Sequence, residues 1–145
     1  MMIKALQHCA LVVRDLERSR WFYGVVLGMD EIPRPANFTF GGAWFRQGPS
    51  EVHLIAARDT TAPAGQPDSG PARSSGLASH VGFEVDDLAA FQRQFVAHHV
   101  DIAAGPMPRG DGVEQVFVHD PDGYFVEVFQ ITDAKAAPQR GPVSR

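Results

Sequence analysis

The sequence predicts an α+β fold made of two modules with the same order of elements, β-α-β-β-β. The stretch HCALVVRDL, His8–Leu16, returns as HVGFEVDDL, His80–Leu88, at a constant offset of 72 residues, since 80 − 8 and 88 − 16 are equal. A second pair, VHLIA from Val52 and VEVFQ from Val126, repeats at an offset of 74, from 126 − 52. Between the copies, residues 58–78 are rich in Pro, Gly, Ser and Ala and have little periodicity, which is typical of a linker.

These repeats divide the chain into a first module, a linker, a second module and a flexible tail. The predicted boundaries are residues 1–57, 58–78, 79–131 and 132–145. A structureless stretch as long as the linker is unusual inside one compact domain but reasonable between two modules. The tail is polar and contains proline, so we expect it to be frayed.

The first module begins with a strand at residues 6–13 that leads into a helix. Asp15 is a plausible helix N-cap, an apolar stripe of helical spacing follows, and Gly28 ends it. Shorter extended segments are expected near Glu31, at 39–46 and at 51–57.

The second module repeats this order. A strand at 79–85 leads into a helix capped by Asp86 or Asp87, with Leu88, Phe91, Phe95 and His98 on its buried stripe. We interpret GPMPRGDG, residues 105–112, as a flexible loop before a strand at 113–119. Asp120-Pro121-Asp122-Gly123 fits a type I turn with a glycine bulge, and a strand at 124–130 follows.

Composition and charge exclude several classes of function. The net charge of −4 and the pI near 5.8 give no basic surface for nucleic acid. No segment approaches the roughly 18 apolar residues of a membrane-spanning helix, and the first residues lack the apolar core of a signal peptide. The single cysteine, Cys9, cannot form an internal disulfide, and we interpret it as a buried thiol. We therefore expect a cytoplasmic protein with no nucleic-acid or membrane partner.

Strand parity places four polar residues on one kind of face. In the strand at 79–85, Val81, Phe83 and Val85 form the apolar face that covers a helix, so His80 faces the opposite side. The same alternation turns Glu127 and His53 away from the helix, and the repeat matches His8 to His80. Two curved mixed sheets with their helices outside would leave these faces lining one half-barrel cavity.

The turn fixes a register that adds residues to this face. If Asp120 pairs with Tyr124, Phe117 lies opposite Glu127, and cross-strand partners share a face. The candidate pocket residues are then Gln115, Phe117 and Phe125, with Trp44 in an aromatic wall contributed by the first module. Arg109, in the loop before this strand, either meets an anionic substrate or remains in solvent.

Three imidazoles and one carboxylate on one face favour a divalent metal ion as cofactor. Neutral imidazole binds Zn, Ni, Mn or Fe, and one carboxylate offsets part of the charge of the ion. We expect His8, His80 and Glu127 to be ligands. His53 has three interpretations that stay open: a fourth ligand, a general base or a hydrogen-bond partner of the substrate. His53 and Glu127 are the candidate catalytic residues.

At this point the sequence resembles the vicinal oxygen chelate superfamily, which includes glyoxalase I, bleomycin-binding proteins and extradiol dioxygenases. The most specific segments are DLERSRWFYGVVLGM and FVHDPDGYFVEVF, and the likeness extends from about Leu6 to Gln130. His8, His80 and Glu127 match three of the family's metal-ligand positions. His53 matches the fourth, where glyoxalase I carries glutamate and epimerases carry glutamine.

The resemblance implies a small metalloenzyme that acts on a small substrate able to chelate the metal ion through oxygen atoms. The leading hypothesis is glyoxalase-like lyase or isomerase chemistry through a stabilised oxyanion or enediolate. One alternative is an Fe(II) extradiol-type dioxygenase, and another is a bleomycin-resistance-like protein that binds a drug without catalysis. Relatives commonly form homodimers, so we expect a homodimer, with the ligands supplied by one chain or by two.

Overall fold

The computed structural model describes residues 2–66 and 75–133, which form two compact units. The first unit consists of described residues within Met1–Asp68 together with Asp120–Tyr124, and the second of those within Ser69–His119 and Phe125–Arg145. The predicted module boundaries stay a prediction. Residues 67–74 of the predicted linker and 134–145 of the predicted tail lie outside the described residues.

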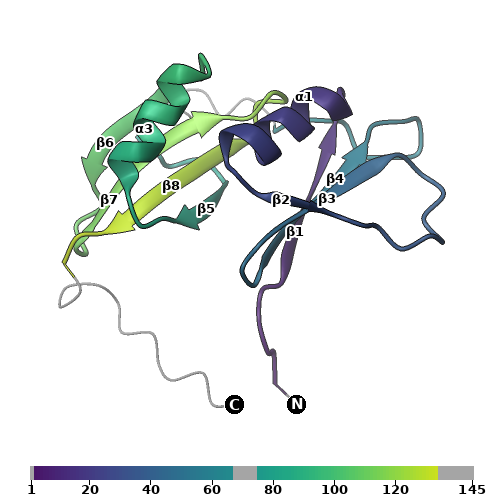
Figure 1. The fold of residues 1–145 in the computed structure, drawn as a ribbon, viewed down its shortest axis with the longest axis horizontal. Helices are drawn as coiled ribbons and strands as arrows, with labels where there is room; N and C mark the ends of the chain where they lie inside the picture. The colour runs from purple at the N-terminus through teal and green to yellow at the C-terminus, as the bar shows by residue number, and fades with distance from the viewer. Residues whose placement is uncertain (1, 67–74, 134–145) are drawn as a thin grey trace. The chain divides into compact units, whose positions relative to one another are not determined.

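Each unit contains a four-stranded mixed sheet, and the strand order is the same in both (Figure 1). The orders are β1-β4-β3-β2 and β5-β8-β7-β6, with the first two strands of each sheet parallel and the other pairs antiparallel. The strands are β1 (His8–Val13), β2 (Asp30–Ile32), β3 (Gly42–Gln47), β4 (Ser50–Ala56), β5 (His80–Glu84), β6 (Ile102–Pro108), β7 (Val113–His119) and β8 (Phe125–Ile131). The predicted α+β class and the repeated β-α-β-β-β order are confirmed.

The repeat extends to the register of the parallel pairs. His8 pairs with Glu51 in the first sheet, and His80 pairs with Phe125 in the second. Since the offsets are 72 and 74 residues, these two pairs are equivalent positions. The sequence repeat therefore corresponds to a structural repeat.

The helix of the first unit begins at the predicted cap and changes its winding halfway. The Asp15 carboxylate accepts hydrogen bonds from two backbone N–H groups at the start of α1 (Leu16–Arg20). A π-helical segment, η1 (Trp21–Val26), follows, and Gly28 after it has φ +71°. The wider turn places both Phe22 and Tyr23 in the core.

The second unit corrects one prediction. Residues 105–112 were expected to be a loop, but Gly105–Pro108 belong to β6, the edge strand beside β7. Pro106 and Pro108 have no N–H to donate, which an edge strand tolerates because one side needs no partner. Two register shifts along this pairing break the alternation on which the prediction relied. The helix α3 (Leu88–Ala97) begins after Asp87, whose carboxylate accepts from the Ala90 N–H.

The predicted turn between β7 and β8 forms, and its bonds lie within the first unit. The Asp120 N–H donates to Tyr124 O, and the Gly123 N–H donates to Asp120 O, both at 3.0 Å. Phe117 lies opposite Glu127, so the predicted register is confirmed. The Tyr23 hydroxyl donates to Asp120 Oδ2 at 2.9 Å, and burial is the main cause that raises the pKa of Tyr23 well above its ordinary value.

Part of the core of each unit comes from the helix-facing strand positions. Val52 and Leu54 of β4, and Val126 and Val128 of β8, are almost completely buried. Since side chains alternate along a strand, the intervening residues emerge on the other face of each sheet. None of the helices in the described ranges is long and apolar enough to cross a membrane.

Candidate metal-binding residues

In the second unit, His80 and Glu127 come together on neighbouring strands. His80 Nε2 lies 3.2 Å from Glu127 Oε2. On the opposite side of the ring, Nδ1 is 2.7 Å from the carbonyl oxygen of Ala78, so Nδ1 carries the proton and donates it. In the neutral form of the ring, this bond leaves Nε2, the atom that faces the carboxylate, with a lone pair.

A glycine makes room for the Glu127 carboxylate. Gly82 pairs directly with Glu127, and a Cβ added to Gly82 would lie 2.8 Å from Glu127 Oε2. A side chain at this position would displace the carboxylate. Glu127 itself is buried, with 6% of its side chain exposed, whereas 31% of the His80 side chain is exposed. The pair is therefore accessible through the imidazole.

Aromatic rings surround this pair. Phe117 and Phe125 stack with ring centroids 4.7 Å apart, and the His80 ring meets Phe117 edge-on at 5.4 Å. Gln115, which shares their face, is 9% exposed. Three of the predicted pocket residues, Gln115, Phe117 and Phe125, thus lie on the face that also carries Glu127.

Arg109 also reaches Glu127. Its Nη1 is 3.5 Å from Glu127 Oε1, its Nη2 is 2.9 Å from Asp111 Oδ2, and its guanidinium lies 5.0 Å from the Phe129 ring centroid. Hydrogen bonding to Asp111 is the main cause that raises the pKa of Arg109. Arg109 is therefore ion-paired within the second unit, and its predicted contact with an anionic substrate stays a prediction.

In the first unit, the His53 ring is held between two other rings. Trp44 stacks on it at 3.9 Å with an angle of 4° between the planes, and His8 stacks at 4.3 Å and 14°. Trp44 also contacts Phe38 edge-on at 5.6 Å. Trp44 and Phe38 thus lie together beside His53, whereas Phe45 of the same strand as Trp44 is buried in the core.

A carboxylate that the sequence analysis missed completes this group. Glu51 Oε2 is 2.7 Å from His53 Nε2, and Glu51 Oε1 accepts from Nε and Nη2 of Arg46 at 2.9 and 2.6 Å. Bonds from His53, then from Arg46, lower the pKa of Glu51 to about 2. The two-residue spacing on β4 already placed Glu51 on the His53 face. The repeat drew attention away from Glu51 because it aligns this position with Phe125.

The four predicted ligands are thus distributed as two pairs, His8 with His53 and His80 with Glu127. Among residues 2–66 and 75–133, no three His, Cys, Asp or Glu side chains are grouped so that they could hold a metal ion. A single centre that joins both pairs therefore stays a prediction.

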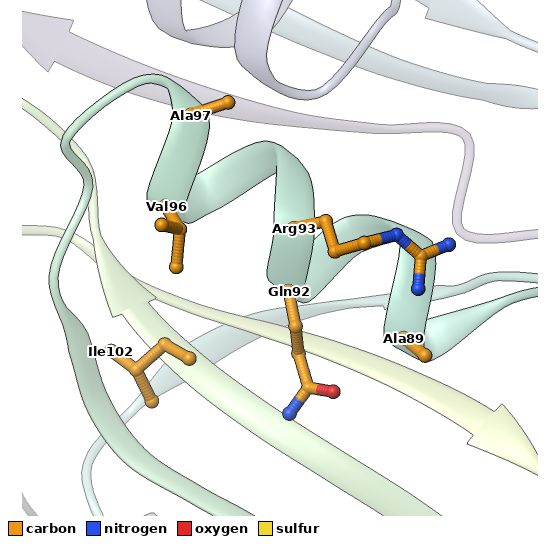
Figure 2. Close-up of a pocket in the computed structure, with 6 residues that line it drawn as sticks. All are labelled: Ala89, Gln92, Arg93, Val96, Ala97 and Ile102. Atoms are coloured by element: carbon orange, nitrogen blue, oxygen red, sulfur yellow. The ribbon is translucent and has the colours of Figure 1, made fainter.

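A hollow of about 450 Å³ lies elsewhere, beside α3 and the start of β6 (Figure 2). Its lining is mainly apolar and comes from α3 and the first residue of β6: Ala89, Gln92, Arg93, Val96, Ala97 and Ile102. None of the predicted site residues contributes to it.

Comparisons with known proteins identify the family and agree with the fold. A family model described as the Glyoxalase/Bleomycin resistance protein/Dioxygenase superfamily matches residues 5–128. Lactoylglutathione lyase of Salmonella typhimurium is 30% identical over 133 residues, which are 89% of this chain and 94% of that protein. Glyoxylase I 4 of Arabidopsis thaliana is 25% identical over 146 residues, 99% of this chain and 80% of that protein. The crystal structure of a glyoxalase/dioxygenase from Nostoc punctiforme has a TM-score of 0.73 at 26% identity and covers 90% of this chain and 92% of its own.

Proposed function

Because the chain belongs to the glyoxalase/bleomycin resistance protein/dioxygenase superfamily, we propose that it is a metal-dependent lyase or isomerase of the glyoxalase type. Its substrate would be a small molecule that offers oxygen atoms for chelation. The observation that carries this proposal is the geometry of His80 and Glu127. The relatives named as glyoxalase I and lactoylglutathione lyase support the same class of enzyme.

The donor atoms of this pair fit a divalent ion. Ligand bonds from imidazole nitrogen and carboxylate oxygen measure about 2.0–2.2 Å, so two such atoms on one ion lie roughly 3.0–3.4 Å apart for octahedral to tetrahedral angles. The observed separation of His80 Nε2 and Glu127 Oε2 is 3.2 Å. The Nδ1–H bond to Ala78 O is the outer hydrogen bond that orients a histidine ligand. A bound divalent ion supplies Lewis acidity, which stabilises negative charge that develops on a substrate oxygen.

The remaining site residues would bind and orient the substrate. Phe117 and Phe125 keep water away from one side of His80, and the Gln115 amide can donate to an oxygen atom. Arg109 would pair with an anionic group once Glu127 is otherwise engaged. His8 and His53 are the other two proposed ligands, and His53 alternatively accepts a proton from the substrate.

A second candidate function is ring cleavage by an Fe(II) extradiol-type dioxygenase. Two histidines and one carboxylate are also the ligand set of non-haem iron oxygenases. This ligand set is the observation that favours the alternative, since His80 and Glu127 already supply one imidazole nitrogen and one carboxylate oxygen 3.2 Å apart.

Metal analysis of the protein purified without a metal-affinity tag tests the proposal. We expect about one zinc, nickel or manganese ion per chain, its loss in His80→Ala, and its retention in the control His98→Ala. Turnover of the hemithioacetal of methylglyoxal and glutathione would then support the lyase. Iron with cleavage of catechols under oxygen would replace the lyase by the dioxygenase. Failure to bind any of these ions would contradict both and leave a ligand-binding protein of the bleomycin-resistance type.

We also propose that the chain forms a homodimer, as members of the superfamily generally do. Light scattering coupled to size-exclusion chromatography tests this, and a mass near 15.8 kDa at micromolar concentration would contradict it.

A further inference from the structure

The environment of Glu51 is built to present one acceptor oxygen to His53. Glu51 is 7% exposed, although carboxylates are rarely buried without a partner. Arg46 occupies Oε1 with two N–H groups, at 2.9 and 2.6 Å. Gln7 also hydrogen-bonds to this carboxylate through its side chain, and Oε2 lies 2.7 Å from His53 Nε2.

These bonds decide which nitrogen of His53 carries the proton. A carboxylate paired with an arginine fork is ionised and only accepts hydrogen bonds. His53 Nε2 must therefore be the donor, which leaves Nδ1 as the nitrogen with the lone pair of the neutral ring. Trp44 and His8 stack on the two faces of the ring, at 3.9 and 4.3 Å, and so restrict its rotation.

The second unit shows that the fold does not require a carboxylate at this position. The equivalent of Glu51 is Phe125, and the equivalent of His53 is Glu127. Phe125 packs on Phe117 and holds no hydrogen bond to Glu127 through its side chain. A structural explanation of Glu51 from the sheet alone is therefore insufficient, since an apolar residue fills the same place in the other sheet.

We propose that Glu51 is a positioning residue for His53. With Arg46 behind it, Glu51 fixes the tautomer and the ring orientation of His53, so that Nδ1 is the atom available to a metal ion or to a substrate proton. This inference rests on the proposed function only in its assumption that His53 serves the reaction. The hydrogen bond between His53 and Glu51 can be tested independently of any reaction.

Nuclear magnetic resonance of the histidine rings tests the inference on the full-length, metal-free protein. At about pH 8, where imidazole groups are ordinarily neutral, we expect a His53 Nε2–H proton that exchanges slowly with water and an unprotonated Nδ1. Glu51→Leu removes the acceptor and should abolish this slow exchange. Glu51→Gln should retain it, because the amide oxygen still accepts. Glu114→Gln, at an exposed position of β7, is the control and should change nothing.

Kinetics on the hemithioacetal of methylglyoxal and glutathione give the second readout. Glu51→Leu should lower kcat about 10- to 100-fold with KM changed less than about threefold, as for other residues that orient a site histidine, and Glu51→Gln should recover most of the loss. A wild-type His53 that carries its proton on Nδ1, or an unchanged kcat in a folded Glu51→Leu, would overturn the inference. If Glu51→Leu does not fold, the spectra of the wild type and of Glu51→Gln test the inference, since both should show the proton on His53 Nε2. A slowly exchanging Nε2–H in a protein without turnover would uphold the hydrogen bond and count against the proposed function alone.

Discussion

The two units have the same strand order and the same register, yet the sheet faces turned away from the helices differ in chemistry. The first unit carries Glu51 beside His53, with Arg46 bonded to the Glu51 carboxylate. The second unit carries the stacked rings of Phe117 and Phe125 beside His80 and Glu127. The helix-facing positions, in contrast, are apolar in both, as at Val52 and Phe45 in the first sheet and Val128 and Phe83 in the second. The opposite face of the second sheet also carries part of the core, because Phe117 and Phe125 pack with Ala78 and Ala104.

The equivalent hairpin turns differ in the same way. Between β3 and β4 the chain turns at Gly48, with exposed residues on both sides. Between β7 and β8 it turns at Asp120–Tyr124, where Asp120 and Asp122 are buried. Asp120 accepts from Tyr23, and Asp122 accepts from Arg14. The first turn only reverses the chain, whereas the second also contributes a buried polar network.

The largest effect on stability is expected when Phe125 of the second unit is replaced by glutamate, the residue at the equivalent position of the first unit. Phe125→Glu places a carboxylate at a position that is 1% exposed and has no arginine fork like that of Arg46. We expect a loss of more than about 4 kcal/mol in the free energy of unfolding, enough to prevent folding. Phe125→Leu, the apolar control, should cost only about 1–2 kcal/mol in urea titrations. Equal losses in the two variants would contradict the contrast between the faces.

The next effect concerns the buried turn. Asp120→Ala leaves the Tyr23 hydroxyl and the backbone N–H groups of Asp122 and Tyr124 without their acceptor. We expect the free energy of unfolding to fall by about 3 kcal/mol, measured by urea titration at neutral pH. Asp59→Ala, an exposed control, should stay within about 0.5 kcal/mol of the wild type. If Asp120→Ala left the free energy of unfolding unchanged, water would have to replace the carboxylate as the acceptor of these hydrogen bonds.

The same carboxyl group predicts a pH dependence. Burial raises the pKa of Asp120 to about 6, above its ordinary value of 3.8. Between these values the folded chain holds more protons than the unfolded chain, so the free energy of unfolding falls as pH rises. The contribution is complete below about pH 4 and lost above about pH 6, and it amounts to about 3 kcal/mol.

Asp120→Asn has no proton to lose and should lack this fall. Urea titrations of both proteins at intervals between pH 4 and pH 7 measure the difference. Parallel curves would show that Asp120 titrates at its ordinary value. Glu51, with a pKa of about 2, acts at lower pH and with the opposite sign, because its stabilising ion pair is lost as pH falls.

The smallest effect concerns Arg109, which competes with a metal ion for Glu127. The guanidinium is 34% exposed and 3.5 Å from the carboxylate, so the pair contributes at most about 1 kcal/mol. Arg109→Gln should tighten zinc binding by about two- to fivefold in a competition titration. Asp111→Asn should weaken zinc binding, because it frees Arg109 to pair with Glu127. A change in the same direction for both variants would contradict the competition.

The fold was predictable where a single local pattern, such as side-chain alternation or a turn motif, determines the structure. Alternation gave the strands around His80 and Glu127, and the turn residues Asp120–Gly123 gave the register of Phe117 opposite Glu127. β6 was not predicted as a strand, because its prolines and its register shifts remove the alternation of side chains. The π-helical winding of η1 was not predicted either, since an apolar stripe indicates a helix but does not tell α-helical from π-helical winding over one turn.

The site was predictable in its residues more than in its bonds. Parity placed His53 on the face away from the helix, and the structure stacks Trp44, predicted only as part of an aromatic wall, on its ring. The link from His53 to Glu51 depends on the reach of one side chain and on Arg46, which a comparison of the two repeats conceals. The predicted convergence of all four ligands stays a prediction, because it depends on more than the register within either sheet.

The turn at Asp120–Tyr124 also has a consequence for the order of folding. Its bonds to Tyr23, Arg14 and Val12 join residues that are 97, 108 and 112 positions apart in the chain. During synthesis the N-terminal sheet can pair its own strands early, but the hydroxyl of Tyr23 must wait until Asp120 has left the ribosome. Contacts of such long separation slow folding, because a large loop has to close first. A fragment that ends before Asp120 would therefore contain all four strands of the first sheet and still lack part of its interior.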